Sequence, residues 1–189
     1  MKNLLYISIV LLAFSCNYSG ETILDSDRTN TYLENDASIN EYENKAFFDF
    51  DAIHHYSTDV DAKAVYDLYE QDSLTDSDKM LMAILMDPVS QDFSFINNLE
   101  KLNFIQKDID SNKLELINDL FKVKIVDEYT ATACEPLYRD VLIFRKNSDI
   151  TGIAKICFGC DKHSIIGAKV PTASFGQSGE YQKLGELLE

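Results

Sequence analysis

The chain has 189 residues, with 32 acidic side chains against 17 basic ones and a formal net charge of −15 at pH 7. Such an acidic surface repels phosphate backbones and anionic lipid headgroups, so nucleic acid is excluded as an expected partner. The charge is uneven, because residues 17–87 hold 17 acidic and 4 basic residues. A basic protein is the partner that this surface would suit.

The chain begins MKNLLYISIVLLAFSC, where Lys2 precedes an almost entirely apolar run that ends at Phe14. The run is too short for a membrane-spanning helix, which needs about 20 residues, and the pattern is typical of a secretory signal peptide. A signal peptide over residues 1–15 leaves Cys16 at the start of the mature chain. Ordinary secretion, with cleavage nearby, is the alternative interpretation.

The AFSC ending resembles the lipobox of bacterial lipoproteins, whose cysteine is diacylated after cleavage just before it. Ala13 stands where the strict pattern has leucine, and relaxed lipoboxes of this kind are similar to those of the Bacteroidota. The segments CEPLYRDVLIF, GIAKICFGC and FGQSGEYQKL likewise resemble uncharacterised small lipoproteins of that group. The resemblance implies a bacterial cell-envelope protein, periplasmic or surface-exposed, and no particular activity. Its membrane contact would be acyl chains on Cys16, such as palmitate, each buried CH₂ contributing about 0.8 kcal/mol.

Residues 16–46 have the composition of a flexible acidic tether, because Asn, Asp, Glu, Ser and Thr leave little apolar surface for a core. A single domain is expected over residues 47–189, a length that suits one core. It opens with the extended segment FFDFDAIHHYSTDVD, and Asp61 at its end would cap a first helix. Thr75 and Asp78 have the spacing of a capping box at the start of a second helix.

Two further helices are predicted in the first two thirds of the chain. One follows Ser94, and the other follows Asp110 or Ser111. Their apolar residues recur at helical spacing and are expected to face the core: Ile96, Leu99 and Leu102 in the third helix, and Leu114, Ile117, Leu120 and Phe121 in the fourth.

After residue 122 the periodicity shifts toward two, which is typical of strands. The segments concerned are VKIVDEYTAT, YRDVLIFRK, DITGIAKICF and HSIIGAKV, and a closing helix follows Ser178. Helices first and strands later predict an α+β domain. We expect N-terminal helices packed on a C-terminal antiparallel sheet of about 3–5 strands, with a closing helix at the C-terminus.

The second and third of these segments, joined by KNSD, predict a hairpin. If Arg145 pairs with Ile150, continuing the register places Cys160 opposite Glu135; a loop one residue shorter places it opposite Cys134. Cross-strand Cβ atoms lie about 4.5–5.5 Å apart, close to what a disulfide needs. The leading interpretation is therefore a structural disulfide between Cys134 and Cys160.

In that interpretation Cys157 is a small buried hydrophobic residue, and the disulfide contributes about 3–4 kcal/mol through the unfolded state. Two alternatives stay open. Cys157 and Cys160 form a C-x-x-C pair that suits thiol-redox chemistry, although it does not begin a helix as the reactive pairs do. Cys134, Cys157, Cys160 and His163 together would make a Cys₃His zinc site.

Two polar motifs are weaker candidates. In HHYSTDVD, His54 and His55 point to opposite faces of a strand, so one core histidine and one solvated histidine are expected rather than a metal site with Asp59 and Asp61. SFGQSGEY, residues 174–181, precedes a helix, where it would bind an anion or simply cap the helix.

The sequence presents no convergent set of acid, base and nucleophile. We therefore expect a cell-envelope lipoprotein whose domain binds or scaffolds rather than catalyses, with no catalytic residues and no cofactor. The alternative is an envelope thiol-redox or zinc-binding protein that uses the Cys134, Cys157, Cys160 and His163 set.

Overall fold

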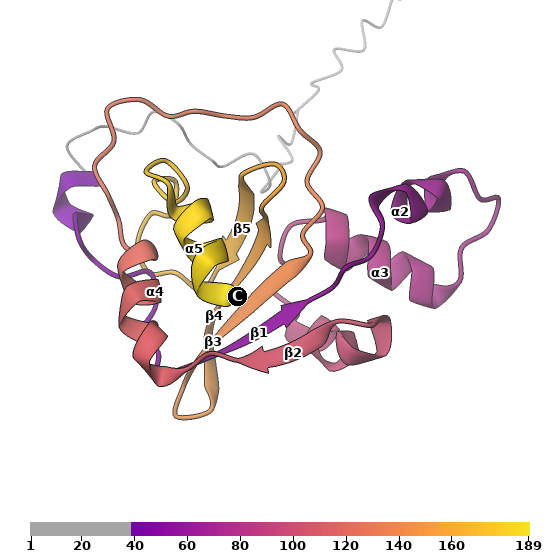
Figure 1. Cartoon of the computed structure of the whole chain (residues 1–189), viewed down its shortest axis with the longest axis horizontal. Helices are drawn as coiled ribbons and strands as arrows, with labels where there is room; N and C mark the ends of the chain where they lie inside the picture. The colour runs from indigo at the N-terminus through magenta and orange to yellow at the C-terminus, as the bar shows by residue number, and fades with distance from the viewer. Residues whose placement is uncertain (1–38) are drawn as a thin grey trace, which may run out of the picture.

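The computed structural model describes residues 39–189 (Figure 1). The predicted signal peptide, Cys16 and most of the expected tether lie outside these residues. Within the described part, no helix combines the length and the apolar character needed to cross a membrane. The domain is of the predicted α+β class, with one antiparallel sheet and helices on both of its faces.

The sheet has the strand order β2-β1-β3-β4-β5, and all neighbouring strands run antiparallel. In chain order the strands are β1 (Ala52–Ser57), β2 (Ile105–Asp108), β3 (Asp140–Lys146), β4 (Asp149–Cys157) and β5 (Lys162–Ile166). The run VLIF lies in the central strand β3 and is fully buried, because the sheet is covered on both faces.

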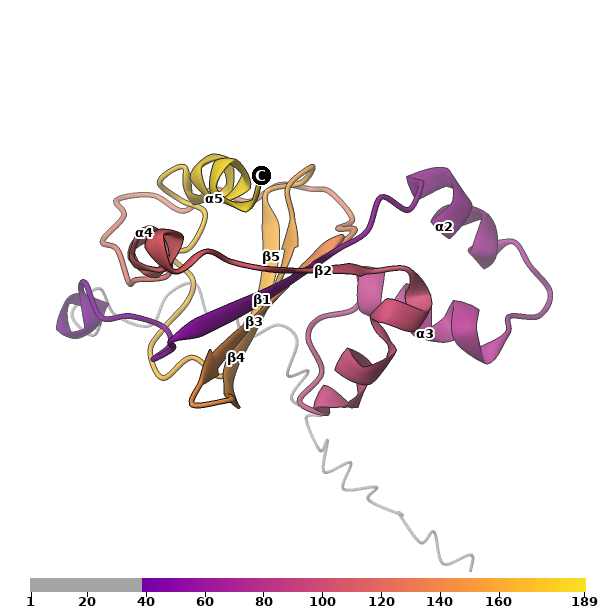
Figure 2. The same cartoon turned by 60° about the horizontal axis from the view of Figure 1, so that its bottom comes forward.

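Within residues 39–189, four α-helices and several short 3₁₀ turns complete the fold. The helices are α2 (Ala62–Tyr69), α3 (Asp76–Met86), α4 (Leu114–Leu120) and α5 (Glu180–Leu188), and the 3₁₀ turns are Asn40–Tyr42, Phe93–Asn98, Glu100–Leu102 and Ser111–Lys113. Figure 2 shows α4 and α5 on one side of the sheet and α3 on the other.

Alternate residues of β3 supply two separate hydrophobic cores. Leu142 and Phe144 pack in the core under α4 and α5, which is rich in phenylalanine. Val141 and Ile143 point the other way and pack in the core under α2 and α3. The two-residue side-chain period of a strand therefore joins both cores through one element.

Both predicted helix caps are confirmed. The side chain of Asp61 accepts a hydrogen bond from the backbone N–H of Lys63 at the start of α2. Thr75 and Asp78 form a complete capping box at the start of α3, with each side chain accepting from the other residue's backbone N–H. These local interactions satisfy amide groups that a helix start otherwise leaves unpaired.

Residues 39–46, expected as the end of the tether, pack with the domain in the structure. Ile39 and Tyr42 contact the phenylalanine-rich core, and Ala46 forms an isolated bridge with Lys122. The backbone N–H of Asn44 donates to the carbonyl of Val123 at 2.9 Å. The packed region therefore includes residues before Phe47, where the domain was expected to begin.

Three local predictions were wrong. The predicted third helix is a pair of 3₁₀ turns, although its Leu99 and Leu102 are buried as expected. VKIVDEYTAT is not a strand, since only its first residue, Val123, exchanges backbone hydrogen bonds with Asn44 and Lys45, and the segment then runs on as irregular backbone. Conversely, β2 was not predicted, because all four of its residues are exposed and carry no apolar pattern.

The β3–β4 hairpin begins in the predicted register and then changes it. Arg145 pairs with Ile150 as expected, but the next pair is Phe144 with Gly152, because a β-bulge inserts one residue. Asn147 and Ser148 form the tight turn, both with positive φ. Neither register considered for the cysteines therefore extends beyond the bulge.

Candidate functional site

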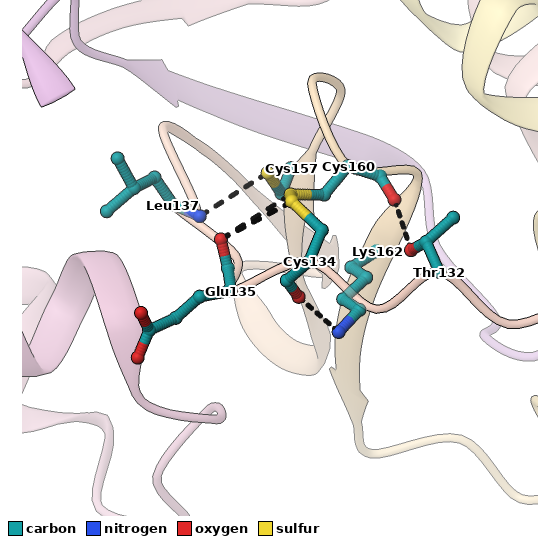
Figure 3. Close-up of a disulfide and its surroundings, with 7 residues drawn as sticks. All are labelled: Thr132, Cys134, Glu135, Leu137, Cys157, Cys160 and Lys162. Carbon is teal, nitrogen blue, oxygen red and sulfur yellow. Dashed lines mark hydrogen bonds between the residues drawn. A yellow bond between two sulfur atoms is a disulfide. The ribbon is translucent and has the colours of Figure 1, made fainter.

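The KICFGCDKH stretch forms the turn between β4 and β5. Cys157 is the last residue of β4, Lys162 is the first of β5, and the two are paired. The backbone N–H of Cys160 donates to the carbonyl of Cys157 at 3.4 Å within the turn. The motif thus lies at one end of the sheet, with its two cysteines in different environments (Figure 3).

The structure joins Cys134 and Cys160 in a disulfide, with their Cα atoms 5.9 Å apart. Cys134 belongs to the α4–β3 connection, which we define as residues 121–139. Further bonds hold this connection to the turn: Thr132 Oγ1 donates to the Cys160 carbonyl at 2.7 Å, and Lys162 Nζ donates to the Cys134 carbonyl (Figure 3). The disulfide therefore pins a long irregular segment to the β4–β5 turn.

Cys157 is the free cysteine of the described residues, and it is buried with 6% of its surface exposed. Its Sγ accepts a hydrogen bond from the backbone N–H of Leu137 at 3.4 Å (Figure 3). The thiol therefore packs beneath the α4–β3 connection, as a small buried side chain does.

His163 lies on the opposite face of the sheet from Cys157, because it pairs with Ile156, one residue earlier on β4. Its Nδ1 is hydrogen-bonded to the Tyr181 hydroxyl at 2.8 Å, and its ring meets the edge of Phe175. Burial lowers the pKa of His163 to about 4, so the imidazole is neutral at physiological pH.

The structure does not bring together the four residues of the alternative zinc site. Two of them share the disulfide, and the remaining pair, Cys157 and His163, point to opposite faces of the sheet. Across residues 39–189 no three His, Cys, Asp or Glu side chains are grouped so that they would hold a metal ion.

The HHYSTDVD histidines are separated as expected. His55 is 3% exposed, and its Nε2 lies 2.8 Å from Oδ1 of Asp140 on β3. Its Nδ1 is buried without a hydrogen-bond partner among the described residues. His54 faces the other way, 3.9 Å from Asp108 on β2. The motif therefore cross-links strands and does not form one site.

The start of α5 is filled by the helix's own first residue. Glu180 is fully buried, accepts from the backbone N–H of Ser178 at 2.8 Å, and pairs with Lys124. Burial alone would raise the pKa of Glu180, but the Lys124 amine and the Ser178 amide together hold it below its ordinary value. The Glu180 carboxylate therefore occupies the helix start, where the SFGQSGEY segment was expected to bind an anion or cap the helix.

A cleft of about 980 Å³ surrounds the free edge of β5. All of β5 lines it, together with parts of three other segments: 88–91, 130–138 and 172–177. Segment 88–91 lies on the α3 side of the sheet, where the Val89 N–H donates to Ser164 Oγ at 2.8 Å. Segment 172–177 lies on the α5 side, where Phe175 contacts His163. The cleft therefore reaches around the strand edge from one face to the other.

The α4–β3 connection forms the remaining wall of this cleft. In Figure 1 it runs from α4 past α5 and β5 to the start of β3. Gln177 holds it near its middle, because its side chain accepts from the Thr130 N–H at 2.8 Å and donates to the Thr130 carbonyl at 3.2 Å. The Cys134–Cys160 disulfide holds it a few residues further along. Both walls of the cleft are thus positioned by specific cross-links.

A second cavity, of about 640 Å³, lies between α5 and the ends of β1 and β3. Its lining includes His55, Ser57 and Asp140, and the C-terminal part of α5 forms one side of it. His55 and Ser57 share one face of β1, but the bonded partner of His55 is Asp140.

Sequence reasoning located the disulfide pair and the buried Cys157 but not the cleft. Its walls come from four stretches of chain, and although SFGQSGEY and KICFGCDKH overlap two of them, no sequence pattern indicates that the four meet. Comparisons with protein-family models, curated proteins and solved structures find no match to this chain.

Proposed function

We propose that this protein is a bacterial cell-envelope lipoprotein, anchored through Cys16, whose domain binds a ligand in the cleft around β5. The short apolar run before Cys16 supports the anchor, and the resemblance to relaxed lipoboxes supports the compartment. An oxidising compartment also suits the Cys134–Cys160 disulfide.

The observation that carries the binding function is the construction of the cleft. A strand edge opens into a cavity of about 980 Å³ whose outer wall is held by two attachments, a disulfide at Cys134 and the hydrogen bonds of Gln177 at Thr130. Ligand cavities in proteins commonly have volumes of about 300–1,000 Å³ and are largely formed before the ligand arrives. The cross-links would provide that preorganisation.

A thermal-shift screen of the mature domain tests this function, with uncharged peptides, glycans and divalent cations as separate probe classes. We expect one class to raise Tm for the wild type and not for Thr172→Trp, whose added indole would obstruct the cleft. Leu116→Trp is the matched control, because Leu116 is 54% exposed on α4 and lies away from the cleft. A shift that is unchanged in Thr172→Trp would rule out the cleft.

The lipid anchor needs its own test. In a bacterial host with the lipoprotein pathway, we expect the full chain to incorporate labelled palmitate and to fractionate with membranes. Cys16→Ala should abolish both properties, whereas Cys134→Ala should keep them. Labelling of the Cys16→Ala chain would contradict the assignment.

A basic partner protein is a second candidate, and it would meet a different surface. Residues 59–92, which include α2 and α3, carry nine acidic and two basic residues. Both lysines are engaged within their own helices, Lys63 with Asp67 and Lys79 with Asp76. Tyr69 is 57% exposed among these charges, and exposed tyrosine is common at interfaces.

Salt dependence distinguishes this surface from the cleft. Association of a basic partner with the acidic helices should weaken steeply between 50 and 300 mM salt, on the order of tenfold or more, because the charges are exposed and screened. Thr172→Trp should leave such binding unchanged. An affinity that does not change with salt concentration would exclude the acidic helices as the contact surface.

A further inference from the structure

The free edge of β5 makes the cleft unlike an ordinary pocket for a small molecule. β5 ends the strand order, and among the described residues β4 is its only strand partner. Every second residue of an edge strand directs its backbone N–H and C=O away from the sheet. In this protein those groups face the cleft, because the cavity is lined by the whole of β5 and extends to both of its faces.

Side chains on the two faces of β5 alternate within the same cleft. His163 and Ile165 belong to the α5 side, and Ile165 packs on the phenylalanine-rich core. Ser164 and Ile166 belong to the α3 side, where Ile166 packs on the second core. A ligand that follows the edge would therefore meet one wall with its odd positions and the other with its even positions.

The charge of the cleft contrasts with that of the chain. Asp161 and Lys162 are the charged residues in the lining, and they adjoin at the disulfide end. The Lys162 amine already donates to the Cys134 carbonyl. Elsewhere the lining consists of uncharged side chains, such as Pro88, Thr172 and Ala173. In a chain of net charge −15, this neutral lining favours an uncharged occupant.

We propose that an extended, uncharged segment of a partner protein binds in the cleft as a sixth strand beside β5. This inference rests on the proposed function and names its ligand class. The backbone of the segment would exchange hydrogen bonds with the outward amides of β5, and its alternate side chains would enter the two walls. The five residues of β5 correspond to about 17 Å of extended chain.

The partner segment is distinct from the chain's own N-terminal part. Residues 17–38 contain five acidic residues and one basic residue, so most five-residue windows of that segment carry charge. Away from Asp161 and Lys162, a charged side chain placed in the neutral walls would lose hydration without gaining an ion pair.

The probe is a synthetic library of nine-residue peptides in which the five central positions are Ala, Ser, Thr or Val. Matched libraries carry one Asp or one Lys at the centre. We expect the uncharged library to yield the tightest binders to the mature wild-type domain, with at least tenfold weaker binding to Thr172→Trp and unchanged binding to Leu116→Trp. Preferred binding of either charged library would overturn the proposal.

N-methylation of the best peptide tests strand addition directly. Methyl groups on the backbone nitrogens that face β5 should weaken binding at least tenfold. Methyl groups on the intervening nitrogens, which face away from β5, should weaken it less than twofold. Amide exchange should slow at alternate residues of β5 when the peptide binds. Equal effects of the two sets of methyl groups would show that the peptide does not bind as a strand.

The remaining outcomes separate this inference from the proposed function. If a glycan or a cation binds in the cleft and no peptide does, the inference fails and the binding function stands. If the outward β5 amides are already protected in the mature chain without a peptide, the chain's own N-terminal segment is the occupant and the partner is ruled out. If no probe is sensitive to Thr172→Trp, both fail.

Discussion

The imidazole Nδ1 of His163 lies 2.8 Å from the hydroxyl oxygen of Tyr181, and this hydrogen bond joins the edge strand β5 to α5. Both groups are neutral, because burial lowers the pKa of His163 to about 4 and raises the pKa of Tyr181. The pair fixes the α5 side of the cleft without placing a charge in it.

This pair predicts a dependence of stability on acid. The folded-state pKa of His163 is about 4 and its unfolded value is about 6.5, so only the unfolded chain takes up the proton between these values. The free energy of unfolding should therefore fall as pH drops from 6.5 to 4, by at most about 1.4 kcal/mol per pH unit from this group. Urea denaturation across that range measures it.

The control for acid sensitivity is a second histidine variant. His163→Gln should remove this contribution to the slope of unfolding free energy against pH. His54→Gln, which replaces a partly exposed histidine on β1, shows the effect of losing a histidine at another position. Identical slopes in the wild type and His163→Gln would contradict the assignment.

Lys155 predicts a dependence of the same sign at alkaline pH. Its side chain is 2% exposed, and Nζ donates to the carbonyls of Asp87 at 2.6 Å and Ala83 at 3.3 Å, at the end of α3. Burial lowers the pKa of Lys155 to about 8, and its unfolded value is about 10.5. Because the unfolded chain holds more protons between these values, this group should increase the free energy of unfolding as pH rises from 8 to 10.

Chemical denaturation at pH 8 and pH 10 compares the wild type with Lys155→Met, in which this gain should vanish. Lys79→Met is the matched control, since Lys79 is exposed and its partner is Asp76 on the same helix. A gain that persists in Lys155→Met would assign it to other groups.

Gly152 is required by the packing of one aromatic ring. A Cβ at this position would overlap the ring of Phe48, which is itself stacked on Phe144 with centroids 4.4 Å apart. Gly152→Ala should destabilise the domain by about 1–3 kcal/mol, because the ring cannot move without disturbing the core. Gly159→Ala, where nothing lies within 4 Å, should change stability by no more than about 0.5 kcal/mol. Equal effects would contradict this packing.

Non-reducing peptide mapping with differential alkylation tests the cysteine arrangement in the purified protein. We expect a Cys134–Cys160 linkage and slow alkylation of Cys157, which is buried beneath the Leu137 N–H. Replacing both linked cysteines by serine should lower the free energy of unfolding by about 3–4 kcal/mol. Three free thiols with stoichiometric zinc, or a readily reduced Cys157–Cys160 bond, would support the redox or zinc alternative.

Sequence patterns predicted elements well where the signal is local. The caps at Asp61 and Thr75 depend on residues two or three positions away, and the apolar run of β3 is continuous. The predicted third helix failed although its leucines are buried, because apolar spacing alone does not distinguish an α-helix from successive 3₁₀ turns. β2 gave no signal, since the strand forms only where β1 offers it an edge.

The sequence by itself determined the class of the domain, the uneven charge and the cysteines that can pair, and it predicts a lipid anchor on Cys16. Only the tertiary structure decided that Cys157 and His163 lie on opposite faces, that a bulge shifts the β3–β4 register, and that a neutral cleft opens along β5. The physical reason is distance along the chain. Caps and periodic faces involve neighbouring residues, whereas the walls of the cleft include segments far apart in the chain, such as 88–91 and 172–177, whose proximity depends on the packing of the whole sheet.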